Sequence, residues 1–383
     1  MVARGAAVIL SDEEVLLWDG DYYYLPMVAV KGKKWLRVCF DASRKQGRHP
    51  SLNDCLLKGP DRFINNLLAV IIGFRNGRVG AAADISKFHN RVLLDEKDKH
   101  MQRFLWRGMD RNIPPRVYAV PVNCFGVKPA NCIATCALQR SAELFAEKYP
   151  EESQELKDQT YVDDQLVAAP SKDLALQKTQ RLDEITDHAG MPNKGWTFSG
   201  DDVSLDFEIG GDQAEIEKVL GIFWSSLKDV FVFKVILKFG PDPSHLVFTS
   251  EDLDRVLLFI TLTRRILLAN VARIFDPVGF LAPIILLSKL LMRESWCGGD
   301  VGWDDALPED LTNRWISFLK SLLKLNDLEF QRSLWPEEEV VGLPSLVVRC
   351  CGLHTVAVET RWLLDQIHHG QMQGCSQGNC VNT

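Results

Sequence analysis

The sequence of 383 residues contains no hydrophobic run long enough to cross a membrane. Its most apolar window, Gly279 to Met292, is shorter than the roughly 20 residues that a spanning helix needs, and it includes Lys289. A secretory signal is also lacking, because three acids at positions 12–14 interrupt the early apolar stretch. We therefore interpret residues 279–292 as a buried helix and expect an intracellular, cytoplasmic protein without a membrane partner.

A disulfide framework, internal repeats and an excess of positive charge are lacking too. The ten cysteines have no regular spacing, so reduced thiols are expected. The net charge of −7 argues against a nucleic-acid binder unless the cations are concentrated locally. Between Lys31 and Arg48, seven Lys and Arg residues accompany the single acid Asp41. This basic strip is either a nucleic-acid contact or a solvated hairpin face.

What is present is enough apolar sequence for two or three packed subdomains, with 46% hydrophobic residues. The most informative segment is Tyr161-Val162-Asp163-Asp164, where two adjacent acids lie between runs of β-forming residues. Such runs predict a hairpin with carboxylates at its tip. A carboxylate at the end of a half-buried strand is costly unless a cation is near, and a divalent metal is a suitable one. Taken alone, the acidic pair is a weak signal, and a solvated turn is the preferred interpretation.

A second strand is expected to end in an acid. Residues 79–83 are small and apolar and lead directly into Asp84. A buried strand that ends in aspartate before a turn is typical of phosphoryl-transfer sites that hold two metals. The two strands thus present three acids, and a shared metal requires Asp84 and Asp163 to lie within a few ångströms of each other.

Four segments occur in the order and rough spacing of reverse transcriptase motifs: Asp84-Ile85-Ser86-Lys87-Phe88, Phe125-Gly126-Val127-Lys128-Pro129, the Tyr161–Asp164 box, and Leu220-Gly221-Ile222-Phe223-Trp224. Three further segments restrict the resemblance to one type of reverse transcriptase; they are residues 38–43, 51–60 and 103–106. Together, over about residues 21–320, the chain resembles the reverse transcriptase of BEL/Pao-type LTR retrotransposons, as a fragment of a Pol polyprotein.

The resemblance implies an α+β fold of the polymerase right-hand type, with fingers, a palm built on an antiparallel sheet, and a helical thumb or connection. We expect an unmatched leader at 1–20, fingers and palm at 21–225, a thumb- or connection-like region at 226–330, and an unmatched tail at 331–383. The periodicity of apolar residues and the positions of Gly and Pro predict helical regions over 61–74, 130–148, 174–189, 253–296 and 311–325. They also predict strands over 79–84 and 116–124.

The activity that the resemblance implies is RNA-directed DNA polymerisation, a nucleotidyl transfer with an RNA template, a DNA primer and deoxynucleoside triphosphates as partners. Two Mg²⁺ ions, with Mn²⁺ as a substitute, are the implied cofactors. Asp84 and Asp163 are the expected metal-bridging ligands, and Asp164 is an auxiliary one. Lys194 is the candidate proton donor to the leaving pyrophosphate, with an exposed loop lysine as the alternative. The implied location is the cytoplasm, including virus-like particles.

Residues for binding the nucleotide and the primer follow from the same resemblance. Arg37 matches the fingers arginine, whose planar fork suits phosphate oxygens. The accompanying lysine is Lys34, with Lys31 or Lys33 as alternatives. Gly126 allows close approach of the backbone to the nucleotide, and Phe125 offers an apolar surface, although an ordinary turn before a helix fits both residues. The remaining nucleotide-binding candidates are Phe88, His89 and Tyr161, and the primer-grip candidates, which plain core would also explain, are Leu220, Gly221 and Trp224.

The chain departs from the family at His89, where the family carries Phe or Tyr beneath the nucleotide sugar. Weaker sugar discrimination is therefore expected. We expect no RNase H, integrase or protease segment. The Cys and His residues of the tail have the spacing of no standard zinc site; they are Cys350, Cys351, His354, His368, His369, Cys375 and Cys380. Two alternatives stay open: a catalytically dead remnant that keeps the fold and at most binds nucleic acid, and an unrelated globular protein with chance motifs.

Overall fold

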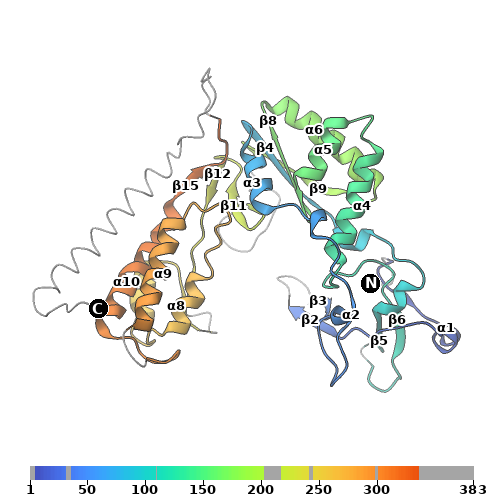
Figure 1. The fold of residues 1–383 in the computed structure, drawn as a ribbon, viewed down its shortest axis with the longest axis horizontal. Coiled ribbons are helices and arrows are strands. Elements are labelled where there is room, and N and C mark those ends of the chain that lie inside the picture. Colours follow the sequence, from blue (N-terminus) through green and yellow to red (C-terminus); the bar gives the residue numbers. More distant parts are fainter. Residues whose placement is uncertain are drawn as a thin grey trace, which may run out of the picture. The chain divides into compact units, whose positions relative to one another are not determined.

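The computed structural model describes residues 5–31, 36–108, 110–201, 217–240, 245–297 and 301–335. The chain forms two compact units that divide between Ser199 and Gly200, and each unit is described by itself. Both units combine helices and sheets, so the fold is mixed α and β (Figure 1). The basic strip expected between residues 31 and 48 includes residues 32–35, which lie outside the described part of the chain.

A four-stranded antiparallel sheet in the order β7-β8-β4-β9 is the centre of the first unit. The strands are β4 (Val79–Ile85), β7 (Thr160–Tyr161), β8 (Asp164–Ala169) and β9 (Asn193–Phe198). Small residues in β4 allow close packing of helices, and Figure 1 shows α4, α5 and α6 gathered beside the sheet. Ala81, Ile85 and Val167 are buried in the shared core. Because side chains alternate along a strand, Asp84 and Asp164 lie on the other face.

Of the two helices expected in this core, one is corrected and one is confirmed. The helix expected over residues 130–148 ends earlier, as α4 (Ala130–Leu144), and α5 (Pro150–Asp158) follows as a separate helix. Pro150 favours a new helix start, because a proline in the first turn removes no intrahelical hydrogen bond. The prediction of a helix over 174–189 is confirmed by α6 (Lys172–His188), whose N-cap Ser171 accepts a hydrogen bond from the amide of Leu174.

Two further elements of the first unit differ from expectation. The helix expected over 61–74 is divided into a single 3-10 turn, Asp61–Phe63, and α3 (Leu67–Arg75), because Asn66 caps a new helix start. The strand expected over 116–124 is wrong in its second half, since β6 (Arg116–Ala119) ends before Pro121. A proline cannot donate to a strand ladder.

The rest of the first unit carries a three-stranded sheet, β1-β6-β5, and a separate hairpin of β2 and β3. Residues expected as an unmatched leader supply β1 (Val8–Ile9), which pairs with β6, while the neighbouring Ala7 and Leu10 are buried. The other elements are β2 (Met27–Lys31), β3 (Leu36–Phe40), β5 (Arg103–Trp106), α1 (Asp12–Leu17) and α2 (Leu52–Cys55).

Within the described residues, the second unit combines a small antiparallel sheet, β10-β11-β12-β15, with four helices. Its strands are β10 (Glu217–Val219), β11 (Ile222–Ser225), β12 (Val230–Val232) and β15 (Glu329–Gln331), with β13 (Leu237–Lys238) paired to β14 (Leu246–Val247). β15 pairs with β12 from far along the chain, so the boundary expected after residue 330 falls inside a strand.

The expectation that residues 253–296 are helical is confirmed, and the region is divided into three helices. These are α7 (Ser250–Leu257), α8 (Arg264–Val271) and α9 (Ala282–Cys297). Thr263 caps α8, and the Asp276 carboxylate accepts hydrogen bonds from three successive backbone amides, 279–281, before α9. The helix expected over 311–325 is present as α10 (Glu309–Leu323). Within the described ranges, no helix has both the length and the apolar character to span a bilayer.

Candidate functional site

The predicted acidic hairpin is confirmed. β7 and β8 pair with Thr160 opposite Gln165 and Tyr161 opposite Asp164, which leaves Val162 and Asp163 as a two-residue loop. Val162 has a φ of 58°, a conformation that a two-residue hairpin usually gives to glycine and that is strained for a β-branched residue. Its side chain packs against the core of the unit, and this packing stabilises the strained loop. The hairpin thus holds Asp163 at its tip.

The strand β4 brings Asp84 to the same end of the sheet. Asp84 lies directly opposite Asp164 in the antiparallel register of β4 and β8. The amide of Ile85 donates a hydrogen bond of 2.8 Å to the carbonyl oxygen of Asp163, which fixes the hairpin tip beside β4. This register agrees with the expectation from the sequence that the acids converge. Like charges directly opposite each other on one face of a sheet destabilise it, so the arrangement is costly unless a cation lies nearby.

The electrostatics of Asp163 reflect this crowding. Partial burial raises the pKa of the Asp163 carboxyl above its ordinary value, and the negative charge of Asp84 raises it further. His89 and Lys194 act in the opposite direction, because positive charge favours the carboxylate. A carboxyl with a perturbed pKa beside a second carboxyl is a common feature of functional sites.

Lys194 reaches the acids through an irregularity in β9. Ala83 pairs with Trp196 and Ile85 with Asn193, so that Lys194 and Gly195 together oppose Asp84 in a β-bulge. Gly195 has a φ of +123°, which L side chains rarely adopt. The bulge directs Lys194 to Asp84, with 2.5 Å between Nζ and Oδ1. A basic group beside the acids was expected, but its direct ion pair with Asp84 was not.

The donor set is consistent with a hard divalent cation. Asp84 Oδ1 is a buried oxygen that accepts no hydrogen bond from any residue the structure describes, although it forms the ion pair with Lys194. Carboxylate oxygens are the ligands that Mg²⁺ prefers, and Mg²⁺ takes the rest of its sphere from water and phosphate. Across the described ranges, no three His, Cys, Asp or Glu side chains are already gathered as a metal site. The tail residues considered for zinc lie outside those ranges.

Of the residues expected to bind the nucleotide, two are exposed and two are buried. Phe125 is 69% exposed, and Gly126 has a φ of +93° in the turn that precedes α4, so both are accessible. His89 is buried, lies edge-on to the Phe125 ring, and has its Nε2 2.6 Å from Oδ1 of Asn131. Phe88 is a core residue, 2% exposed, which corrects its expected contact with a nucleotide.

The three remaining nucleotide-binding candidates are Tyr161, Arg37 and Lys34. Tyr161 is half-buried on β7, directly across from Asp164. Arg37 lies on β3 opposite Val30, and its side chain is outside the described part. Lys34 is outside the described residues altogether. The structure therefore does not place the expected phosphate-binding cations.

The primer-grip candidates belong to the second unit. Leu220 and Gly221 form the two-residue turn between β10 and β11, both with positive φ. A Cβ on Gly221 would lie 2.7 Å from the Phe275 ring, so a side chain has no room there. Trp224 is fully buried and donates from Nε1 to Asp229 Oδ1 at 3.0 Å. Trp224 is thus a core residue, in agreement with the alternative interpretation and not with a primer contact.

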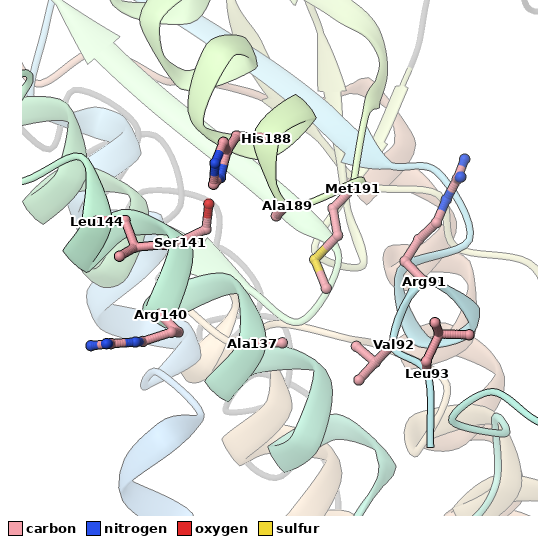
Figure 2. A pocket seen from close by; sticks show the side chains of 10 residues that line it. All are labelled: Arg91, Val92, Leu93, Ala137, Arg140, Ser141, Leu144, His188, Ala189 and Met191. Atoms are coloured by element: carbon pink, nitrogen blue, oxygen red, sulfur yellow. The ribbon is translucent and has the colours of Figure 1, made fainter. Parts of the chain in front are cut away.

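A cavity of about 350 Å³ in the first unit contains none of the expected site residues. Figure 2 shows Met191 and Val92 in its interior, with Arg91 and Arg140 extending outward. Both arginines already have partners, since Arg91 donates to the Ser86 carbonyl and Arg140 pairs with Glu143. The cavity is lined by Arg91, Val92, Leu93, Ala137, Arg140, Ser141, Leu144, His188, Ala189 and Met191.

Several amide side chains near the site carry no expectation from the sequence. Asn131 contacts His89, while Gln102 donates to the carbonyls of Val120 and Val122 and accepts from the amide of Cys124. Asn53 contacts the Phe125–Lys128 turn. A signal for Asn53 existed, because it lies in a segment that carries the family resemblance, but nothing in the sequence assigns it a partner.

Comparison with known proteins gives one family match. Residues 263–347 match the family model described as the Pao retrotransposon-like RNaseH-like domain. No curated protein matches the chain. The match supports an origin in a BEL/Pao retrotransposon Pol protein, and it does not bear specifically on reverse transcriptase.

The family match corrects the expectation that the chain has no RNase H segment. It covers α8, α9, α10 and β15, which lie in the region assigned to a thumb or connection, and it extends beyond the described residues. The apolar periodicity of these helices is the same whether they cover a thumb or another α/β domain, so the sequence pattern could not distinguish the two. Similarity to an RNaseH-like domain indicates a nucleic-acid-processing family that binds nucleic acid.

Proposed function

We propose that the chain is the RNA-directed DNA polymerase domain of a BEL/Pao retrotransposon, joined to an RNaseH-like segment. The observation that supports this most strongly is the convergence of Asp84, Asp163 and Asp164 at one end of the β7-β8-β4-β9 sheet. The Pao family match gives independent support for the origin of the chain. A polymerase right hand and two-metal nucleotidyl transfer are the finer parts of this proposal.

In the proposed reaction, Asp84 and Asp163 would hold two Mg²⁺ ions, and Asp164, beside the hairpin tip, would be an auxiliary residue that influences metal affinity. Bound Mg²⁺ would lower the pKa of the primer 3′-hydroxyl and stabilise the charge on the triphosphate. Asp84 would supply its Oδ1, which Lys194 contacts in the structure. The exposed Phe125 and Gly126 offer the surface for the incoming nucleotide. Lys194, released from Asp84, donates a proton to the leaving pyrophosphate.

The second candidate is a catalytically dead remnant that keeps the fold and at most binds nucleic acid. It is favoured by His89 at the position of the family's aromatic ring, where it is held by Asn131. Primer extension on an RNA template, with deoxynucleotides and Mg²⁺, separates the two candidates. Extension by the wild type that is abolished in Asp163→Asn supports the polymerase, whereas RNA binding without extension supports the remnant.

A further inference from the structure

Asn53 lies in the short helix α2, and its hydrogen bonds connect this helix to the Phe125–Lys128 turn. Its Nδ2 donates to the carbonyl oxygen of Gly126 at 3.0 Å, and its Oδ1 accepts from the amide of Lys128 at 2.7 Å. The ammonium of Lys128 also donates to the Asn53 carbonyl at 2.9 Å. The amide orientation is fixed by these partners, because exchanging Nδ2 and Oδ1 would place donor against donor and acceptor against acceptor.

The second Nδ2 hydrogen connects Asn53 to the segment that follows β3. It donates to Ser43 Oγ at 2.8 Å, and the backbone amide of Asn53 donates to the carbonyl of Ala42 at 3.0 Å. Ser43 is in turn held by Asp41, whose Oδ1 accepts from its amide at 3.1 Å. Asn53 thus uses both amide hydrogens and its amide oxygen, and it joins its own helix and the nearby Ala42–Ser43 segment to a turn 73 residues further along the chain.

The position of Asn53 within α2 is itself fixed by a capping box. Ser51 accepts from the amide of Asp54, and the Asp54 carboxylate accepts from the amide of Ser51. Lys45 lies 3.4 Å from the same carboxylate. The residues 51–54 therefore form a rigid support for the Asn53 side chain, and they need no contact with substrate to do so.

The turn that Asn53 holds is the exposed part of the proposed nucleotide site. Gly126 has a φ of +93°, and a Cβ there would lie 3.4 Å from the Phe40 carbonyl oxygen. The Phe125 ring lies edge-on to His89, 5.5 Å away between ring centroids. A small displacement of the Gly126 backbone would move the adjacent Phe125 ring relative to His89 and to a bound base.

We infer that Asn53 is a positioning residue: its side-chain amide holds the backbone of Gly126 and Lys128, and thereby places Phe125 for the incoming nucleotide. The inference rests on the proposed polymerase function and adds to it a residue that touches no substrate. Its role is distinct from that of the acids, because it acts on nucleotide binding and not on the chemical step.

Two variants and one control test the inference in the full chain. Asn53→Ala removes all three side-chain hydrogen bonds, and Asn53→Asp keeps the shape and the acceptor but cannot donate to Gly126. Asn66→Ala is the matched control, because Asn66 also makes a side-chain hydrogen bond at a helix start, to the amide of Ala69, and does not contact the turn. The readouts are hydrogen exchange at the Lys128 amide without substrate, and KM and kcat for single-nucleotide incorporation.

We expect faster exchange at Lys128 in Asn53→Ala and little change there in Asn53→Asp, because the acceptor of the Lys128 amide remains. Both variants should have a roughly tenfold higher KM for the deoxynucleotide, the factor set by one or two neutral hydrogen bonds. The KM for template–primer and the behaviour of Asn66→Ala should not change. Unchanged exchange at Lys128 in Asn53→Ala, or faster exchange there with an unchanged nucleotide KM, would overturn the inference. A rise in both KM values together with lower thermal stability would also overturn it, as general damage to the fold.

The polymerase function can fail separately. If the wild type extends no primer, the proposed function is wrong, and the exchange measurement still decides whether Asn53 holds the turn.

Discussion

The ammonium of Lys194 lies 2.5 Å from Oδ1 of Asp84, so that one proposed metal ligand is already paired with a protein cation. The pair exists because a bulge places two residues of β9 opposite a single residue of β4. A divalent ion at Asp84 has to compete with this ammonium. The same lysine can therefore oppose metal binding before the reaction and donate a proton during it.

Lys194→Met should lower the Mg²⁺ concentration needed for half-maximal activity several-fold and also lower the maximal rate. The first effect follows from removing a competing positive charge, and the second from removing a proton donor. Mg²⁺ titrations of primer extension measure both quantities. Lys58→Met is the control, because Lys58 also pairs with an aspartate, Asp61, on an exposed surface. An unchanged Mg²⁺ requirement in Lys194→Met would show that the pair does not compete with the metal.

Asp163→Asn should stabilise the protein at pH 7 in the absence of divalent metal. Burial first, and then the charge of Asp84, raise the pKa of Asp163 in the folded state. The folded state therefore binds this proton more tightly than the unfolded state, and stability falls as the pH rises through the interval between the two pKa values. The penalty is complete above the folded pKa and absent below the ordinary value of 3.8.

The gain in unfolding free energy for Asp163→Asn should be less than about 1 kcal/mol, because a half-exposed charge is screened by solvent. Urea unfolding of the wild type and the variant at pH 7 and near pH 3 measures the difference. The two proteins should differ at the higher pH and converge at the lower one. A gain of the same size at both values would mean that the ionisation of Asp163 is not its source.

Arg332→Met should destabilise the second unit by roughly 3–5 kcal/mol, the cost of leaving one member of a buried ion pair alone. Arg332 is fully buried and makes two hydrogen bonds to Asp229, of 2.6 and 2.8 Å. The same carboxylate accepts from Trp224, so the variant also removes support from this buried ring. Urea unfolding followed by circular dichroism measures the loss. Lys228→Met, which removes the exposed pair with Glu329 nearby, should cost less than about 1 kcal/mol. Equal effects of the two variants would contradict this account.

The positions of the acids could be predicted from the sequence, but the contacts around them could not. Alternation and turn chemistry predict a hairpin that presents Asp163, and a strand that ends in Asp84, because both depend on neighbours in the chain. The contact of Lys194 with Asp84 depends on a β-bulge, and no local sequence pattern predicts that bulge. Arg332 and Asp229 are 103 residues apart, and their pairing depends on a three-residue strand, β15, that is too short to predict.

Replacement of His89 by Phe should increase the preference for deoxynucleotides over ribonucleotides. His89 is buried with its Nε2 2.6 Å from Asn131 Oδ1, so its ring is held in one place beside Phe125. A phenyl ring is larger than imidazole and cannot hydrogen-bond a 2′-hydroxyl, so it should exclude the ribose more strongly.

The measurement is the ratio of kcat/KM for a deoxynucleotide and the matching ribonucleotide, in the wild type and in His89→Phe. The wild type should incorporate the two with similar efficiency, and the ratio should rise by roughly tenfold or more in the variant, the range that pocket shape alone provides. Asn131→Ala is the companion variant, because it frees the imidazole without enlarging the ring, and it should leave the ratio near that of the wild type. A strong deoxynucleotide preference in the wild type would refute the idea that His89 weakens sugar selection. The smaller, polar imidazole would then exclude the 2′-hydroxyl as well as a phenyl ring does.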